Sequence, residues 1–205
     1  MKRIGLTGGI GCGKSTVVAE LRRQGIPCYV ADDVARGFYD DPDFVARVGQ
    51  ALGTKVANAD GTADRQAIAR IVFADAEKLA ILNRLIHPLV MERFDHFCSE
   101  QRGQKAVFFE SAILYEHGLD KAMDAVATVY LDRQERIRRL AERDHSTEGE
   151  ISARMANQLP DEEKLARADF VILNYEGNPR QRQVREMLER LAGKETQQAK
   201  QQARQ

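Results

Sequence analysis

Gly8-Gly9-Ile10-Gly11-Cys12-Gly13-Lys14-Ser15 follows directly on the apolar run Ile4-Gly5-Leu6-Thr7 and fits the pattern G-x-x-x-x-G-K-[ST]. A strand that leads into glycines and then into a helix turns several backbone N–H groups toward one point, where the helix dipole adds positive potential. The amphipathic stretch Ser15-Thr16-Val17-Val18-Ala19-Glu20-Leu21 supplies the helix. The sequence therefore predicts a loop that binds the phosphates of a nucleotide.

Two side chains of this loop have chemistry suited to a polyphosphate. Lys14 can reach the β- and γ-phosphates as a mobile positive charge, and the Ser15 hydroxyl can complete the ligand shell of a Mg²⁺ ion. A glycine-rich turn that only joins a strand to a helix would also contain glycines, but it leaves Lys14 unexplained. The residues predicted to contact the nucleotide here are Gly9, Gly11, Cys12, Gly13, Lys14, Ser15 and Thr16.

The composition limits the size and the partners of the protein. A chain of 205 residues is long enough for one buried α/β core with an inserted subdomain. Its 31 lysines and arginines balance 31 aspartates and glutamates, so no overall charge attracts nucleic acid or an acidic membrane. No apolar run approaches membrane-spanning length, and the N-terminus enters a strand without a signal peptide. We expect a soluble protein in which any affinity for anions is local.

The cysteines indicate the compartment. Cys12, Cys28 and Cys98 are scattered, without a C-x-x-C pair or a histidine at a metal-binding spacing. This pattern argues against a disulfide framework and against a zinc site. Thiols of this kind suit the reducing cytosol, so the sequence predicts a cytoplasmic protein.

Five short runs rich in β-branched and aromatic residues alternate with helical stretches. Such alternation predicts a parallel sheet, and the near-continuous apolar runs predict helices on both of its faces. The fold class is therefore α/β, a three-layer sandwich of the P-loop NTPase type with a five-stranded parallel sheet. Ligands are expected at the carboxyl ends of the strands. The predicted strands are residues 2–7, 27–31, 105–110, 125–131 and 169–174.

About seventy residues separate the second and third strands, far more than one crossover helix needs. This connection predicts a helical subdomain. Pro42 opens one helix, a second runs from Asp64 toward Phe73, and a third carries leucines up to Ile86. His87-Pro88 is expected to interrupt the third helix, because the residue before a proline is pushed away from helical geometry. By spacing alone, His87 is either a partly buried residue at a kink or a ligand-facing residue.

Arg136, Arg139 and Arg143 share one face of a helix that starts at Asp132. Arginines on one face suit an anion clamp. They also suit a solvated face on which glutamates of the same helix balance the charge. The helix begins at the carboxyl end of a strand beside the phosphate loop, which favours a clamp over the γ-phosphate.

Ala31-Asp32-Asp33 follows the second strand and places a carboxylate at the carboxyl edge of the sheet. In phosphoryl transfer an aspartate can orient the attacking hydroxyl and accept its proton. The alternative role is a cap for the next helix, for which Asp33 is the better candidate. No Asn-Lys-x-Asp motif for guanine recognition occurs, which makes a GTPase unfavourable.

With these motifs the chain resembles the dephospho-coenzyme A kinase family. Leu6 to Thr16 reproduce the family's opening Leu-Thr-Gly-Gly-Ile-Gly-x-Gly-Lys-Ser-Thr. Val30 to Arg36 match its Asp-Ala-Asp-x-x-Ala-Arg except at Val30, which places the family's catalytic aspartate on Asp32. Leu85 to Val90 are similar to its Leu-x-His-Pro-Leu-Ile segment, so the resemblance puts His87 on the acceptor-substrate side.

Four further segments carry the resemblance, which covers almost everything up to about residue 190. Ala112 to Glu116 stand where the family has Pro-Leu-Leu-Phe-Glu, which keeps Glu116 and leaves the conformation of a loop without its proline open. Arg139 to Asp144 resemble the family's lid motif Arg-x-x-x-Arg-Asp. Arg154 to Gln158 and Ala168 to Asn174 resemble its Arg-x-x-x-Gln and Ala-Asp-x-Val-Ile-x-Asn segments.

The resemblance implies a three-part kinase that uses ATP and Mg²⁺ to phosphorylate the ribose 3′-hydroxyl of dephospho-coenzyme A. The parts are a nucleotide-binding core (1–37, 102–132 and 161–193), a helical insertion that holds the acceptor (38–101), and a lid (133–160). Residues 194–205 are expected to form a frayed helical or disordered tail. Closure of the lid and the insertion would exclude water.

The resemblance also assigns roles to single residues. Catalytic roles fall to Asp32, Lys14 and Arg139, further ATP contacts to Arg139, Arg143 and Asn174, the metal contact to Ser15, and acceptor contacts to Asp32, His87 and Glu116. A monomer or weak homo-oligomer is expected. Two alternatives remain: another P-loop small-molecule kinase, of the nucleoside monophosphate or shikimate type, or a non-catalytic nucleotide-gated binding module.

Overall fold

A computed structural model describes the backbone of residues 1–202 and the side chains of residues 1–193. The chain forms two compact units. The first contains Met1–Tyr29 and the chain from Gln101 onward, and the second is Val30–Glu100. The second unit thus begins before the predicted insertion, and it includes Asp32. Among the described residues, no helix is both long and apolar enough to cross a membrane.

The first unit is built on a five-stranded parallel sheet with the strand order β2-β3-β1-β4-β5. β1 lies at its centre, where Ile4 stands beside Phe108 of β3 and Ala125 of β4. These three side chains are buried, as the apolar runs predict. The α/β sandwich is confirmed, and each strand lies within one residue of its predicted bounds. The strands are β1 (Lys2–Thr7), β2 (Cys28–Val30), β3 (Ala106–Glu110), β4 (Ala125–Tyr130) and β5 (Phe170–Leu173).

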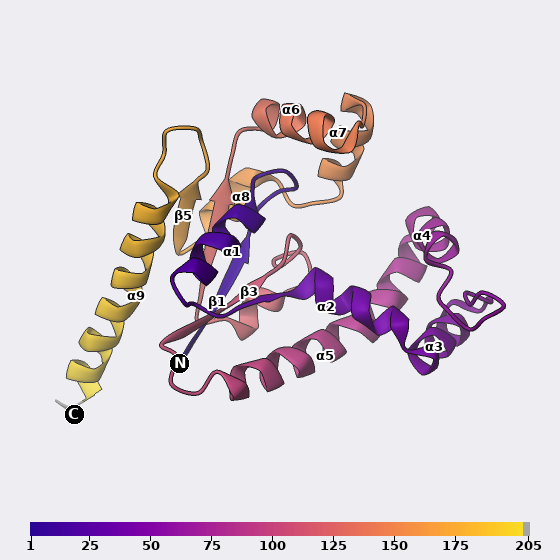
Figure 1. Cartoon of the computed structure of the whole chain (residues 1–205), viewed down its shortest axis with the longest axis horizontal. Coiled ribbons are helices and arrows are strands. Elements are labelled where there is room, and N and C mark those ends of the chain that lie inside the picture. Colours follow the sequence, from indigo (N-terminus) through magenta and orange to yellow (C-terminus); the bar gives the residue numbers. More distant parts are fainter. Residues whose placement is uncertain (203–205) are drawn as a thin grey trace. The chain divides into compact units, whose positions relative to one another are not determined.

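Helices of the first unit cover the sheet and extend beyond its carboxyl edge (Figure 1). α1 buries Val17, Val18 and Leu21. α9 contacts β5 and α1, and α8 contacts β4. The predicted lid comprises α6 and α7. These elements are α1 (Lys14–Arg23), η2 (Leu119–Ala122), α6 (Arg133–Asp144), α7 (Glu148–Ala156), α8 (Asp161–Arg167) and α9 (Arg180–Gln202).

The C-terminal segment was expected to be a frayed helical or disordered tail. Residues 194–202 continue α9 as helix, and residues 203–205 lie outside the described residues. Strong helix formers such as Glu, Gln, Ala and Lys dominate this segment, so intrinsic propensity alone favours continuation of the helix.

The second unit is helical, as the spacing predicts. Pro42 stands in the first turn of α3 and Asp41 caps that helix, while the Asp64 side chain accepts the Ala67 N–H at the start of α4. Apolar side chains of α3, α4 and α5 form one core that includes Phe44, Val48, Ile68, Val72 and Leu82. The elements are α2 (Ala31–Gly37), η1 (Phe38–Asp40), α3 (Pro42–Leu52), α4 (Arg65–Ala74) and α5 (Ala76–Glu100).

The expected break at His87-Pro88 is wrong. α5 runs unbroken from Ala76 to Glu100 with Pro88 inside it. A proline inside a helix costs about 3 kcal/mol, because it removes one hydrogen bond and crowds the preceding turn. Apolar residues before Pro88 (Leu82, Leu85) and after it (Leu89) pack on the same core. Burial on both sides of the proline therefore outweighs the local cost.

Candidate active site

The loop between β1 and α1 has a backbone that requires glycine. Gly13, the residue before α1, has a φ of 88°, in the left-handed region that side chains disfavour. A Cβ at Gly13 would also lie 2.0 Å from Asn174 Nδ2. The Cys12 N–H donates to the Gly9 carbonyl at 3.1 Å, which closes the loop on itself. The chain thus leaves the strand, turns tightly and enters the helix, as the motif predicts.

Lys14 holds its ammonium group at the start of α1. Lys14 Nζ donates to the Gly8 carbonyl at 3.0 Å and lies 3.9 Å from Glu110 Oε1. Both side chains are 12% exposed. The first turn of α1 contains no acidic residue, and the N–H groups of Lys14 and Ser15 have no preceding helical carbonyl to bind. A cation beside N–H donors that no helical carbonyl accepts, at a helix N-terminus, fits an anionic ligand.

Glu110 is a neighbour of this site that the sequence analysis did not assign. It ends β3 beside Leu6 of β1, at the same edge of the sheet as the phosphate loop. The available signal was an acidic residue that closes an otherwise apolar strand. Parallel strands bring their carboxyl ends to one edge, so the position was predictable once the strand order was known.

Helix α6 rests directly on the phosphate loop. A Cβ at Gly9 would lie 1.9 Å from Arg136 Nη1, and a Cβ at Gly11 would lie 2.8 Å from Leu140 Cδ1. Contacts this close leave room only for hydrogen at both positions. The first helix of the predicted lid is therefore packed on the loop in this structure.

Arg136 is not part of an exposed arginine face. Only 4% of the residue is exposed, and its guanidinium group pairs with Asp161 in the first turn of α8. Burial raises the pKa of the Asp161 carboxyl above its usual value, and the charge of Arg136 opposes that shift. The predicted face of three arginines is therefore not formed, because Arg136 is buried against Asp161. Helical spacing does not reveal this contact, since Asp161 lies on another helix.

Arg139 and Arg143 pair with carboxylates of their own helix. Arg139 Nε donates to Glu135 at 2.8 Å, and Arg143 Nε donates to Asp144 at 2.7 Å. A hydrogen bond from Arg138, and a smaller contribution from Arg139, lower the pKa of Glu135 to about 2. The geometry therefore contains the pairing expected of a solvated face, and an ATP contact by either arginine stays a prediction.

Asn174 and Cys12 contact each other at the back of the loop. Asn174 Nδ2 donates to the Cys12 carbonyl at 2.8 Å, and Asn174 Oδ1 accepts from Arg180 at 3.0 Å. Asn174 is buried, and so is Cys12. Burial raises the pKa of the Cys12 thiol, and Lys14 opposes the rise. Both residues fix the loop backbone, and a direct contact to ATP stays a prediction for each.

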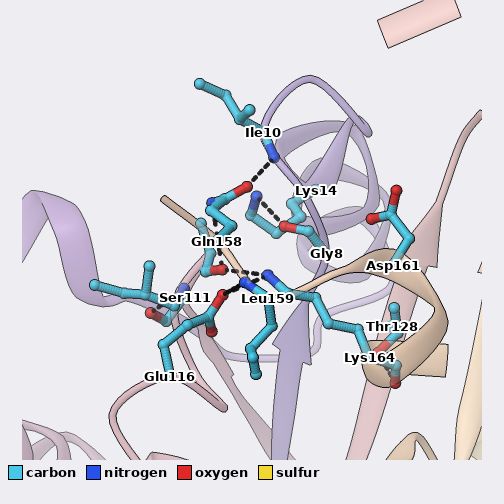
Figure 2. Close-up of polar contacts among 12 residues, drawn as sticks. Gly8, Ile10, Lys14, Ser111, Glu116, Thr128, Gln158, Leu159, Asp161 and Lys164 are labelled. Carbon is cyan, nitrogen blue, oxygen red and sulfur yellow. Dashed lines mark hydrogen bonds and ion pairs between the residues drawn. The ribbon is translucent and has the colours of Figure 1, made fainter. Parts of the chain in front are cut away.

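Glu116 belongs to a buried polar cluster beside the loop (Figure 2). Its Oε1 lies 2.8 Å from Lys164 Nζ and accepts the Leu159 N–H at 2.9 Å. Lys164 Nζ also donates to the Ala112 carbonyl at 3.0 Å. A backbone carbonyl thus anchors the segment that lacks the family's proline. Glu116 Oε1 therefore already has two partners within the protein. The contact of Glu116 with the acceptor stays a prediction.

Asp32 and Asp33 lie in the second unit, in the first turn of α2. The alternative role as a helix cap is not seen for either residue: α2 starts at Ala31, its N-cap is Val30, and no side chain caps it. The helix begins directly after β2, so both carboxylates fall inside its first turn. Their negative charge there interacts favourably with the helix dipole. Asp32 pairs with Arg36 at 2.5 Å, and both are exposed. His87 is half-buried within α5.

A parallel α/β sheet with this glycine loop, its lysine and its helix N-terminus defines a nucleotide-binding protein of the P-loop class. A family model described as dephospho-CoA kinase matches residues 2–179. The chain belongs to the dephospho-CoA kinase family. Its activity is that of a dephospho-CoA kinase, a phosphotransferase.

Individual relatives agree with the family model. The chain is 40% identical to a dephospho-CoA kinase of Corynebacterium glutamicum over 179 residues, which cover 85% of this chain and 88% of the relative. It is 40% identical to one of Shouchella clausii over 175 residues, covering 84% of this chain and 89% of the relative.

Solved structures share the fold. TT1252 from Thermus thermophilus has a TM-score of 0.82 and 32% identity over 91% of this chain and 95% of its own. The dephospho-CoA kinase of Campylobacter jejuni has a TM-score of 0.60 at 22% identity, over 93% of this chain and 97% of its own. A shikimate kinase of Acinetobacter baumannii has a TM-score of 0.53 at 13% identity over 95% and 94%, so that likeness concerns the fold alone.

Proposed function

We propose that this kinase moves the γ-phosphoryl group of ATP to the ribose 3′-hydroxyl of dephospho-coenzyme A. The hydroxyl oxygen forms a bond to the γ-phosphorus, the bond from that phosphorus to ADP breaks, and the hydroxyl proton passes to a carboxylate. Most of the acceleration in such a transfer comes from positioning and charge stabilisation. The observation that carries the proposal is the phosphate loop with Lys14 at the N-terminus of α1, in a chain of this family.

The residues around Lys14 fit ATP with a magnesium ion. Magnesium is usually held by one or two protein oxygens together with substrate phosphates, and a dedicated cage of acidic residues is not required. Ser15 offers a hydroxyl in the first turn of α1, and Glu110 offers a carboxylate at the end of β3. The ion would neutralise charge that develops on the phosphates. Arg139, Arg143 and Asn174 remain proposed ATP contacts.

An assay with a panel of hydroxyl acceptors tests this function. ADP release is measured with dephospho-coenzyme A, nucleoside monophosphates, shikimate and no acceptor. Turnover only with dephospho-coenzyme A, and a phosphate found on its ribose 3′-oxygen by NMR, is the expected result. Turnover with another acceptor would favour a different small-molecule kinase, and ATP binding without turnover would favour a binding module.

Asp32 is proposed as the group that orients the acceptor hydroxyl and accepts its proton. Asp32→Asn should lower kcat by roughly 10²-fold or more, with little change in the affinity for ATP, because a positioned proton acceptor acts only in the chemical step. Steady-state kinetics with both substrates and calorimetry with ATP measure these quantities.

Two matched variants separate this role from local helix effects. Asp33→Asn removes an exposed carboxylate from the same turn of α2, and Arg36→Gln removes the partner of Asp32. Both should stay within a few-fold of the wild type. If Asp33→Asn is the damaging change, the family's aspartate has been placed on the wrong residue. If Arg36→Gln matches Asp32→Asn, the ion pair explains the loss.

Arg139 is proposed to contact the ATP phosphates when the lid closes. Arg139→Lys should lower kcat more than it raises the KM for dephospho-coenzyme A, because a planar guanidinium makes paired contacts that strengthen as charge develops on the transferring group. Its present partner is Glu135. Steady-state kinetics at varied concentrations of each substrate give both constants.

Arg138→Lys is the control for Arg139→Lys, because Arg138 precedes Arg139 on α6 and also pairs with Glu135. Arg136 cannot serve as a neutral control, since it is buried. Near-wild-type activity in both the Arg138 and Arg139 variants, with stability changed by less than about 1 kcal/mol, would mean that these arginines form only a solvated face.

His87 and the second carboxylate oxygen of Glu116 remain proposed contacts for the acceptor. A cytoplasmic location and a monomeric or weakly associated state are proposed as well. Cell fractionation tests the first, and sedimentation velocity across a range of protein concentrations tests the second.

A further inference from the structure

In the polar cluster that surrounds Lys164, the function proposed above gives a role only to Glu116. Lys164 lies on α8 and is 0% exposed, yet it carries an ammonium group. Its partners are the Glu116 carboxylate and the Ala112 carbonyl, both in the segment after β3. A lysine is almost never fully buried unless it is paired, so this cluster is a built feature of the interior.

Gln158 extends this cluster to the phosphate loop. Its Oε1 accepts the Ile10 N–H at 2.8 Å, and its Nε2 lies 3.5 Å from the same Ala112 carbonyl that Lys164 binds. The next residue, Leu159, donates its N–H to Glu116. Figure 2 shows Gln158 between Ile10 on one side and the Lys164–Glu116 pair on the other. The phosphate loop is thereby joined to a buried ion pair through one carboxamide.

The partner of the Ile10 N–H matters for the direction of the loop's other donors. Each peptide unit is planar, so a bond to one N–H fixes the orientation of the carbonyl before it. Gln158 holds the Ile10 N–H, while the Cys12 N–H is held by the Gly9 carbonyl. These two bonds set the path of the backbone ahead of Gly13, Lys14 and Ser15, whose N–H groups lead into the phosphate site.

We propose that Gln158 is a positioning residue for phosphoryl transfer. It fixes the phosphate loop by accepting the Ile10 N–H, and it is itself held at the Ala112 carbonyl beside the buried Lys164–Glu116 pair. Gln158 acts through the loop backbone and touches neither substrate. Without the carboxamide, the Gly9–Ile10 peptide keeps only the bond from the Cys12 N–H to its carbonyl, and the loop loses preorganisation toward the transferring phosphate. The proposal rests on the kinase function above.

The test replaces Gln158 by methionine, which has similar length but cannot accept the Ile10 N–H. Gln158→Met should lower kcat by about 10-fold or more and weaken ADP binding, measured by calorimetry, several-fold. The KM for dephospho-coenzyme A should change less than twofold, because other residues make the proposed contacts to the acceptor. Gln158→Glu keeps an acceptor oxygen for Ile10 beside the Lys164 cation, so it should recover most of the kcat.

Gln183→Met is the matched control. The Gln183 side chain also binds backbone groups, since it accepts the Leu173 N–H at 2.8 Å and donates to the Leu173 carbonyl at 2.9 Å. Its loss removes the same kind of bonds from the edge of β5. We expect kinetic constants within twofold of the wild type for this variant. If Gln158→Met does not fold, Gln158→Asn, which withdraws the amide by one CH₂ group, carries the same expectation.

Each outcome bears on the proposal. A folded Gln158→Met with wild-type kcat and ADP affinity would overturn it, as would a loss equal to that of Gln183→Met. Failure of Gln158→Glu to recover activity beyond Gln158→Met would do so too. ADP affinity is measured without turnover, so a wild-type protein that fails to phosphorylate dephospho-coenzyme A would refute the proposed function and leave this test intact.

Discussion

Lys14→Ala is expected to lower kcat by about 10²-fold or more, a loss of roughly 3 kcal/mol of transition-state stabilisation, while the protein stays folded. The ammonium group lies at the N-terminus of α1 with its Nζ 3.0 Å from the Gly8 carbonyl. That bond and a 3.9 Å approach to Glu110 together contribute about 1 kcal/mol to folding. The charge of Lys14 is preorganised for the phosphate that is transferred.

Steady-state kinetics and thermal unfolding of the same preparation measure the two effects. Arg23→Ala is the control, because it removes a positive, ion-paired side chain from the last turn of the same helix. Arg23→Ala should retain activity and lose little stability, since its pair with Glu20 lies on the surface. Near-normal turnover of Lys14→Ala with an unchanged melting temperature would contradict the assignment of this loop as the phosphate site.

The sheet was predictable because its information is local. The apolar run of β3 is buried where the sequence predicts it, from Ala106 to Phe109. For β5 the predicted burial on both faces is wrong, because Phe170 and Ile172 are buried while Val171 and Leu173 are exposed. The phosphate loop was also predictable, because glycine at position 13 and the lysine after it follow from one short motif. Periodicity of 3.6 residues likewise identified the core faces of α3 and α5.

The errors arose where a contact between distant segments decides the structure. Pro88 sits inside an unbroken helix because both flanks of the helix pack on one core. Arg136 is buried because Asp161, which helical spacing does not bring onto its face, receives its guanidinium group. Gln158 meets the phosphate loop across most of the chain. Helical spacing and propensity describe neighbours within a few residues, so they cannot predict contacts between residues that are distant in the sequence.

The Lys164–Glu116 pair gives the largest stability effect that we expect outside the apolar core. Lys164→Met should lower the free energy of unfolding by about 3–5 kcal/mol, because it leaves a mostly buried carboxylate without its cation. It also removes the donor to the Ala112 carbonyl. Urea unfolding followed by circular dichroism measures this change, with Arg182→Met as the control for an exposed pair in α9, expected to cost less than about 1 kcal/mol.

A double-mutant cycle with Glu116→Gln decides whether the stability comes from the charges or from packing of the lysine stem. Glutamine at 116 still accepts the Leu159 N–H, but it carries no charge that needs Lys164. The double variant should therefore be less destabilised than the sum of the single variants, by about 1–3 kcal/mol. Strict additivity would mean that Lys164 stabilises the fold only through its apolar stem. A coupling of the expected size would mean that the charge of Lys164 holds the segment after β3 against the segment that carries Gln158.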